Sequence, residues 1–150
     1  MNLPFDFEHY LEQGIVKKQS SNIPRAKFLF DESSKAKIGL DRRVEKMGID
    51  EFNVNSIIKD VHDIIIEMIR AKMFVDGFSA SGNFAHEAEV SYLKKLNFLE
   101  SEIIFINELR MARNGITYYG KLYQVDYAIK VVDFLKKIYP KLVALLSKLK

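Results

Sequence analysis

The segment RMARNGITYYG, residues 110–120, holds the densest group of side chains in the chain that could bind a phosphate. Residues four apart share one face of a helix, so Arg110, Asn114 and Tyr118 form one row. Arg113 and Thr117 form the neighbouring row. A guanidinium fits two phosphate oxygens, an asparagine amide donates to phosphate or ribose, and a tyrosine ring stacks on a base. The pattern predicts a polar strip suited to nucleotide or RNA.

Gly115 lies within this predicted helix, where glycine costs about 1 kcal/mol relative to alanine. In exchange it would allow a ligand to approach the backbone beside the arginines. A plainer interpretation competes with this one. The arginines would pair with Glu108 or with acids of a neighbouring helix, and the tyrosines would fill the edge of the core. The pattern is compatible with both.

Other residues that could take part in catalysis or metal binding are supported by weaker sequence patterns. The three histidines, His9, His62 and His86, have no second histidine three or four residues further on. His86 and Glu89 have the i, i+3 spacing of two metal ligands, but a zinc site needs at least three protein ligands. His86 could instead cap a helix or line the same cleft as the arginines. Acidic pairs such as Asp60 with Asp63, and Glu87 with Glu89, are typical of exposed helix faces. The GFSASG segment lacks the strand, turn and helix of a nucleophile elbow. We expect no metal and no cofactor.

Composition narrows the class of protein. A chain of 150 residues with 48% hydrophobic and 29% charged residues is typical of one globular domain. The absence of cysteine excludes disulfides, thiolate metal sites and a cysteine nucleophile. No apolar run is long enough to span a membrane, and the first residues lack the basic region of a signal peptide, so we expect a cytoplasmic protein without membrane contact.

The net charge of +3 is small, but its distribution is uneven. Residues 121–150 contain seven lysines and only Asp126 and Asp133 as acids. Such a basic end is either a weak indication that the protein binds a polyanion or an ordinary solvated lysine face.

Helical periodicity runs through nearly the whole chain, and no segment alternates as a strand of useful length would. It predicts an all-α antiparallel bundle of about five to six helices. We expect one domain, with residues 1–21 as N-terminal helix and connector and residues 22–146 as the bundle core. The first expected helix covers residues 5–18, and the second runs from a cap at Ser21 or Asn22 to Gly48. The third runs from Asn53 or Asn55 to Phe74 or Val75, and the fourth from Phe84 to Leu96. The fifth runs from Asn97 through Arg113 to Gly120, and the sixth from Gln124 through Ile138.

Two details of these helices carry further expectations. Pro140 should kink or break the last helix, because proline lacks an N–H and crowds the preceding turn. The third helix has a broad apolar stripe that includes Ile57, Ile58, Ile64 and Ile65. A stripe this broad serves either the core alone or also a partner, and it favours a homodimer.

Three segments in this order carry a family resemblance: NSIIKDVHDIIIEMIRAKMFVDGF, GNFAHEAEVSYL and ELRMARNGITYYG, the last followed by a long amphipathic helix. They are similar to prokaryotic HEPN domains (higher eukaryotes and prokaryotes nucleotide-binding). The resemblance covers residues 22–146 and rests on the order and spacing of loose motifs. It implies an all-α bundle of four or five helices that dimerises.

The resemblance also implies a function. Active HEPN proteins are metal-independent ribonucleases, and many pair with a minimal nucleotidyltransferase as a toxin–antitoxin system. Their signature is an arginine, a polar residue directly after it, and a histidine separated from the arginine by four to six residues. Two subunits bring two such motifs into one cleft. In this chain Arg113 and Asn114 match the first two, while the histidine position falls at Tyr118, Tyr119 or Gly120.

The missing histidine matters because imidazole, with a pKa near 6.5, both takes and gives a proton at neutral pH. A tyrosine, with a pKa near 10, is a poor base there. Arg113 could still stabilise a phosphate, since charge stabilisation requires no proton transfer. Three outcomes stay open: slow cleavage with Tyr118 as the substitute, binding without cleavage, or a dimeric interaction module.

The sequence thus predicts an RNA- or nucleotide-binding domain with residual ribonuclease activity as one alternative. The expected catalytic residues are Arg113, Asn114 and Tyr118. The expected phosphate- or nucleic-acid-binding residues are Arg110, Arg113, Asn114, Tyr119 and Lys121. The alternative function is a non-catalytic scaffold that partners a nucleotidyltransferase or another protein.

Overall fold

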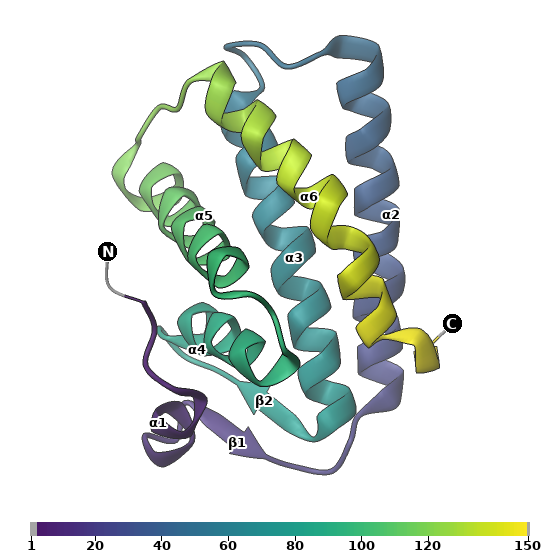
Figure 1. The fold of residues 1–150 in the computed structure, drawn as a ribbon, viewed down its shortest axis with the longest axis vertical. Coiled ribbons are helices and arrows are strands. Elements are labelled where there is room, and N and C mark those ends of the chain that lie inside the picture. Colours follow the sequence, from purple (N-terminus) through teal and green to yellow (C-terminus); the bar gives the residue numbers. More distant parts are fainter. Residues whose placement is uncertain (1–2, 150) are drawn as a thin grey trace.

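The computed structural model describes residues 3–149 and is an all-α bundle with one small sheet at its edge (Figure 1). Within these residues the elements are α1 (Phe7–Glu12), β1 (Val16–Lys18), α2 (Ile23–Met47), α3 (Val54–Asp76), β2 (Phe78–Ala80), α4 (Ala85–Tyr92), a 3₁₀ turn (Leu93–Leu96), α5 (Glu100–Tyr119), α6 (Val125–Leu145) and a second 3₁₀ turn (Ser147–Leu149). The predicted fold class is confirmed.

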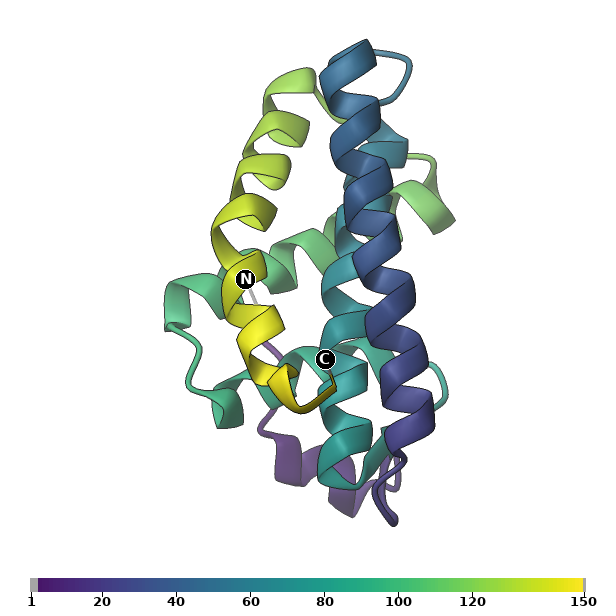
Figure 2. The ribbon, with the colours of Figure 1, turned by 90° about the vertical axis from the view of Figure 1, so that its right-hand side faces the viewer.

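Helix α3 lies at the centre of the bundle. Helix α2 runs beside it, α6 crosses it obliquely, and α4 and α5 pack on it from another side (Figures 1 and 2). Neighbours on several sides bury most of its residues. The broad isoleucine stripe, Ile57, Ile58, Ile64 and Ile65, is at most 2% exposed and faces the chain's own core. This stripe therefore serves the core alone and supplies no surface for a partner.

The ends of α2 and α3 follow from local chemistry. The Asn22 side chain caps α2 by accepting a hydrogen bond from the Arg25 N–H at 3.2 Å, as an N-cap residue does. Gly77 ends α3 in the left-handed region, with φ 87°. A β-carbon at Gly77 would lie 2.6 Å from the backbone oxygen of Gln19, so the connector before α2 requires glycine here.

The sequence prediction was wrong at the N-terminal end. The first helix ends at Glu12 rather than at residue 18, because Gly14 takes a left-handed conformation with φ 74° and turns the chain. Residues 16–18 then form β1, which pairs antiparallel with β2 so that Val16 faces Ala80. Three of the nine residues of the segment DGFSASGNF, residues 78–80, therefore form a strand that the sequence analysis did not predict. This small sheet ties the N-terminal segment to the end of α3.

Two later helices also differ from expectation. The predicted fourth helix becomes α4 plus a 3₁₀ turn, and Asn97 ends the turn with a left-handed φ of 61°. Helix α6 continues through Pro140 to Leu145 instead of ending there. Pro140 and Lys136, whose carbonyl loses its helical partner, both lie on the exposed face, so water can satisfy the carbonyl. Burial of Leu142 anchors the next turn.

No helix of residues 3–149 is long and apolar enough to cross a bilayer.

Candidate nucleic-acid interface

The C-terminal half of α5 borders an open cavity of about 550 Å³, within the size range of small-ligand sites. Its walls come from α5, from the loop that follows, and from the start of α6. We call it the α5 cavity. Its lining residues are Glu108, Arg110, Met111, Ala112, Asn114, Gly115, Tyr119, Lys121, Tyr123 and Tyr127.

Four of the predicted binding residues meet at this cavity: Arg110, Asn114, Tyr119 and Lys121. They combine two cations, an amide and an aromatic ring, which are the groups predicted to bind a phosphate and a base. Gly115 forms part of the wall and lies within α5. The Lys121 side chain passes over it, because a β-carbon at Gly115 would lie 2.9 Å from Lys121 Cδ. The glycine thus makes room for a protein side chain rather than for a ligand alone.

Two tyrosines that the sequence analysis missed form an aromatic wall. Tyr123 and Tyr127 stack with their ring centroids 5.2 Å apart and an interplanar angle of 30°. Burial, the neighbouring Tyr123 and the charge of Glu108 raise the pKa of Tyr127 to about 12, so its hydroxyl stays protonated at neutral pH. Spacing on one helix could not reveal this pair, since Tyr123 lies in the loop after α5.

The loop that carries Lys121 and Tyr123 is fixed by α3. The Asn55 amide donates a hydrogen bond to the Lys121 carbonyl at 2.9 Å. The Tyr123 N–H donates to Asn55 Oδ1 at 3.3 Å. One side chain at the first turn of α3 therefore holds both the cation and the aromatic wall of the α5 cavity in place.

Arg113 and Tyr118, two of the three predicted catalytic residues, are not among the residues that line the α5 cavity. Tyr118 is 68% exposed and Tyr119 is 79% exposed, so neither fills the edge of the core. Arg113 is half-buried, and its Nε is buried without a hydrogen-bond partner among residues 3–149. The structure thus brings Asn114 into the cavity but separates it from the other two.

Arg110 partly fits the alternative interpretation, in which the arginines pair with acidic residues of a neighbouring helix. Its Nη2 lies 3.9 Å from the Glu87 carboxylate on α4, and its Nε donates to Asn107 Oδ1 at 3.1 Å. It therefore pairs with an acid of a neighbouring helix while it also lines the cavity. This ion pair places the α5 cavity next to α4, the helix that carries His86.

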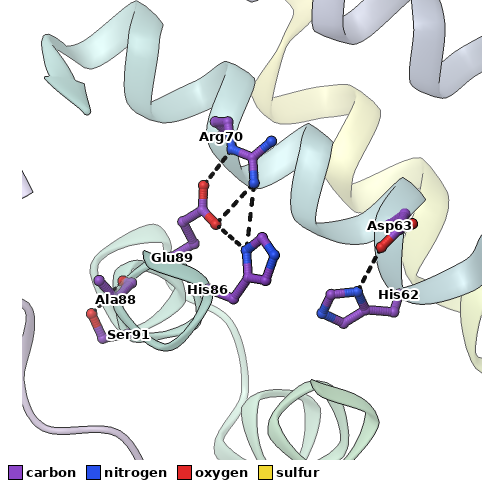
Figure 3. Close-up of polar contacts among 7 residues, drawn as sticks. All are labelled: His62, Asp63, Arg70, His86, Ala88, Glu89 and Ser91. Atoms are coloured by element: carbon purple, nitrogen blue, oxygen red, sulfur yellow. Dashed lines mark hydrogen bonds and ion pairs between the residues drawn. The ribbon is translucent and has the colours of Figure 1, made fainter. Parts of the chain in front are cut away.

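A second polar group lies where α3 faces α4, and it comprises His62, Asp63, Arg70, His86 and Glu89 (Figure 3). We call it the histidine cluster. The imidazole Nδ1 of His62 is 2.9 Å from Asp63 Oδ1, and that of His86 is 2.9 Å from Glu89 Oε1. The two rings meet edge to face, with centroids 5.5 Å apart. Each histidine is therefore one half of a carboxylate–imidazole pair.

Glu89 is the anchor of the cluster because its side chain is 0% exposed. Arg70 binds it through two nitrogens, Nε to Oε2 at 2.6 Å and Nη2 to Oε1 at 3.2 Å. Arg70 Nη2 also lies 3.5 Å from His86 Nδ1. A carboxylate bound by a guanidinium only accepts hydrogen bonds, so His86 Nδ1 is the donor to Glu89. This fixes the tautomer and leaves the lone pair of His86 on Nε2.

The electrostatics of the cluster keep His62 neutral. Its side chain is 1% exposed, and this burial lowers its pKa despite the opposing bond to Asp63. Burial raises the pKa of Asp63, but the hydrogen bond from His62 and the charge of Arg113 outweigh it and lower that pKa. Arg113 also opposes protonation of His62. The Arg113 guanidinium is thus directed to the side of α5 that faces the histidine cluster.

From the sequence, His86 with Glu89 was a possible half of a metal site, and His86 alone a possible helix cap or a residue of the cleft. The structure shows that they bond to each other, and residues 3–149 contain no group of three or more histidine, cysteine or acidic side chains able to hold a metal ion. His62 was missed because it lies 24 positions before His86 on another helix, and local spacing carries no information on such a pair.

Comparison with known proteins adds no relative: no family model, curated protein or solved structure matches this chain.

Proposed function

We propose that this chain is an RNA-binding helical domain of the HEPN type that holds a single-stranded RNA or a nucleotide in the α5 cavity. The observation that carries the proposal is the meeting of two cations, an amide and three tyrosines around one hollow of about 550 Å³. Cations that neutralise phosphates beside aromatic rings that stack on bases are the general means of binding single-stranded nucleic acid. The HEPN resemblance, which rests in part on the same segment of α5, points to the same ligand class.

Each wall of the cavity has a distinct part in the proposal. Arg110 and Lys121 neutralise backbone phosphates, and Asn114 donates to phosphate or ribose. The stacked pair Tyr123 and Tyr127 offers its ring face to a base. Because Asn55 fixes the loop before the ligand arrives, binding would require little further ordering of the protein.

The test is fluorescence anisotropy with a labelled single-stranded RNA over a range of salt concentrations. Tyr123→Ala should weaken binding by roughly 5- to 150-fold, because one base stack is worth about 1–3 kcal/mol. Lys121→Ala should reduce the slope of log K against log salt by about 0.7, since one phosphate contact is lost.

Two matched variants control for the general loss of a tyrosine or of a positive charge. Tyr118→Ala removes an exposed tyrosine of α5 that lies outside the cavity lining. Lys130→Ala removes an exposed lysine of α6. Both should bind as the wild type does. Equal losses in the cavity variants and in these controls would show that binding is non-specific, and unchanged binding by the cavity variants would refute the site.

A second candidate function is a dimeric scaffold, with a nucleotidyltransferase as one class of partner. It is favoured by large apolar side chains that face solvent at one end of the bundle. Phe52 in the α2–α3 turn and Leu122 in the α5–α6 loop are each 89% exposed. The bonds from Asn55 to Lys121 and Tyr123 bring these two segments together. Exposed apolar groups of this kind mark protein interfaces.

A further inference from the structure

We infer that the α5 cavity prefers guanine to the other bases, because Glu108 offers a carboxylate to the edge of the base that the cavity holds. The inference rests on the proposed function, since it requires a nucleotide in the cavity, and it names the base that this site recognises. It gives a role to the acid among the lining residues, which binding of phosphate alone does not explain.

The first argument is that Glu108 is not neutralised within the chain. Its side chain lines the cavity, is half-buried, and forms no hydrogen bond or ion pair with another residue of 3–149. Arg110, the nearest arginine along α5, pairs with Glu87 of α4 instead. A half-buried carboxylate of this kind gains most from a ligand that supplies hydrogen-bond donors.

The second argument is the floor of the cavity. Glu108, Ala112 and Gly115 follow at steps of four and three, so they share one face of α5, and all three line the cavity. The helix rises by roughly 10 Å from Glu108 to Gly115, and the Lys121 side chain lies over Gly115. The carboxylate and the ammonium therefore lie at opposite ends of a floor made of two small residues. The base edge and the phosphate of a nucleotide are separated in the same way.

The third argument is the aromatic wall beside this floor. Tyr123 reaches α5, because its hydroxyl would lie 3.5 Å from a β-carbon at Gly115. Tyr127 stacks on Tyr123, and burial, Tyr123 and the charge of Glu108 together raise the pKa of Tyr127. The Glu108 carboxylate therefore lies close enough to Tyr127 for its charge to act there. A base stacked on this wall would present an edge to Glu108.

Guanine is the base whose edge matches a carboxylate. An ionised carboxylate only accepts hydrogen bonds, and it does so through two oxygens. The Watson–Crick edge of guanine carries two adjacent donors, N1–H and the exocyclic amine. Adenine and cytosine place an acceptor nitrogen next to their amine, and uracil has one N–H between two carbonyl acceptors. Glu108 would repel these acceptors and the phosphates alike, so it lowers the affinity for every ligand except a base with two donors.

The experiment measures fluorescence anisotropy of a labelled single-stranded oligouridine with guanine, adenine, cytosine or inosine at one central position. The wild type should bind the guanine strand more tightly than the adenine strand by roughly 5- to 150-fold, the effect of one bidentate pair. Inosine keeps N1–H but lacks the exocyclic amine, so its affinity should lie between the two. 7-Deazaguanine keeps the Watson–Crick edge and should bind as guanine does.

Two protein variants test the carboxylate itself. Glu108→Gln keeps the shape of the side chain but replaces one acceptor by a donor, so the ratio of guanine to adenine affinity should fall below about threefold. Glu100→Gln removes an exposed acid from the first turn of the same helix, outside the cavity lining, and should keep the wild-type ratio. The ratio cancels any general gain in RNA affinity that follows from the loss of a negative charge.

The outcomes separate this inference from the proposed function. Equal affinity of the wild type for all strands, or a guanine preference that survives Glu108→Gln, would overturn the inference and leave the binding proposal in place. A preference that Glu100→Gln also abolishes, or that 7-deazaguanine abolishes, would overturn it as well, since the carboxylate at the Watson–Crick edge would not be its source. Wild-type protein that binds none of the strands would overturn both proposals.

Discussion

His62 shows how burial can determine the charge of a side chain. With its ring 1% exposed, the neutral form is favoured and the pKa lies below its ordinary value. In the unfolded chain the same imidazole titrates near 6.5. Below that pH the unfolded state takes up a proton that the folded state resists, so His62 makes the fold less stable as the pH falls. The stabilising contribution of neutral His62 is fully present above pH 6.5.

We predict that the free energy of unfolding falls between pH 7.5 and pH 5.5, with His62 contributing at most about 1.4 kcal/mol per pH unit below 6.5. Urea unfolding at the two pH values measures it. His62→Asn can keep a donor toward Asp63 but does not titrate, so its loss of stability should be smaller. His9→Asn is the control and should follow the wild type. An equal pH dependence in all three proteins would exclude His62 as the source.

The residues of the candidate site were predictable where they lie close together in the sequence, as Arg110, Asn114, Tyr119 and Lys121 do. Helical periodicity placed Arg110 and Asn114 together, and the structure finds both at the α5 cavity. The same periodicity placed Arg113 in the neighbouring row, but its charge acts on His62 and Asp63 of α3 instead. The partnership of His62 with His86 depends on how two helices pack, which the spacing within either helix does not encode.

At the scale of elements, α5 and the loop after it act as one unit. The Gly120 N–H and the Lys121 N–H both bond to the Gly115 carbonyl, which closes the helix and turns the chain back. Lys121 then lies across Gly115. The small residue in α5 therefore determines the depth of the cavity and the position of its cation.

Gly115→Ala tests this coupling. Alanine should gain up to about 1 kcal/mol of helix stability, but its β-carbon would lie 2.9 Å from Lys121 Cδ and must displace that flexible side chain. We expect thermal stability equal to or above that of the wild type, together with weaker RNA binding. Gly39→Ala in α2, where an added β-carbon contacts nothing within 4 Å, should stabilise the protein without changing affinity. Marked destabilisation by Gly115→Ala would contradict the coupling.

Long helices were predictable from periodicity and capping, and the short elements were not. Asn22 and Gly48 bound α2 as expected. Strands of three residues are too short to show alternation, and β1 was therefore absorbed into the first predicted helix. The expected break at Pro140 does not occur, because α6 continues to Leu145. The cost of a proline within a helix depends on whether the freed carbonyl faces water, and exposure is a property of the packed bundle.

At the scale of the whole molecule, we predict a homodimer formed through the apolar end that includes Phe52 and Leu122. Sedimentation at micromolar concentration should give about twice the chain mass of 17.4 kDa. Leu122→Asp should give a monomer, because a charge buried in an apolar interface is unfavourable. Ile38→Asp, an exposed position on α2, should remain dimeric. A wild-type monomer would leave the apolar end for another partner.

The central position of α3 has a consequence for how the chain is made. A helix with so broad an apolar stripe has no stable existence alone in water and would aggregate. Synthesis from the N-terminus releases α2 before α3, so the apolar face of α2 is available for packing when α3 emerges. The two can form a hairpin of local contacts at once. Helices α4, α5 and α6 arrive later, and until then the uncovered sides of α3 are the chain's most vulnerable surface to chaperones, proteases and other nascent chains.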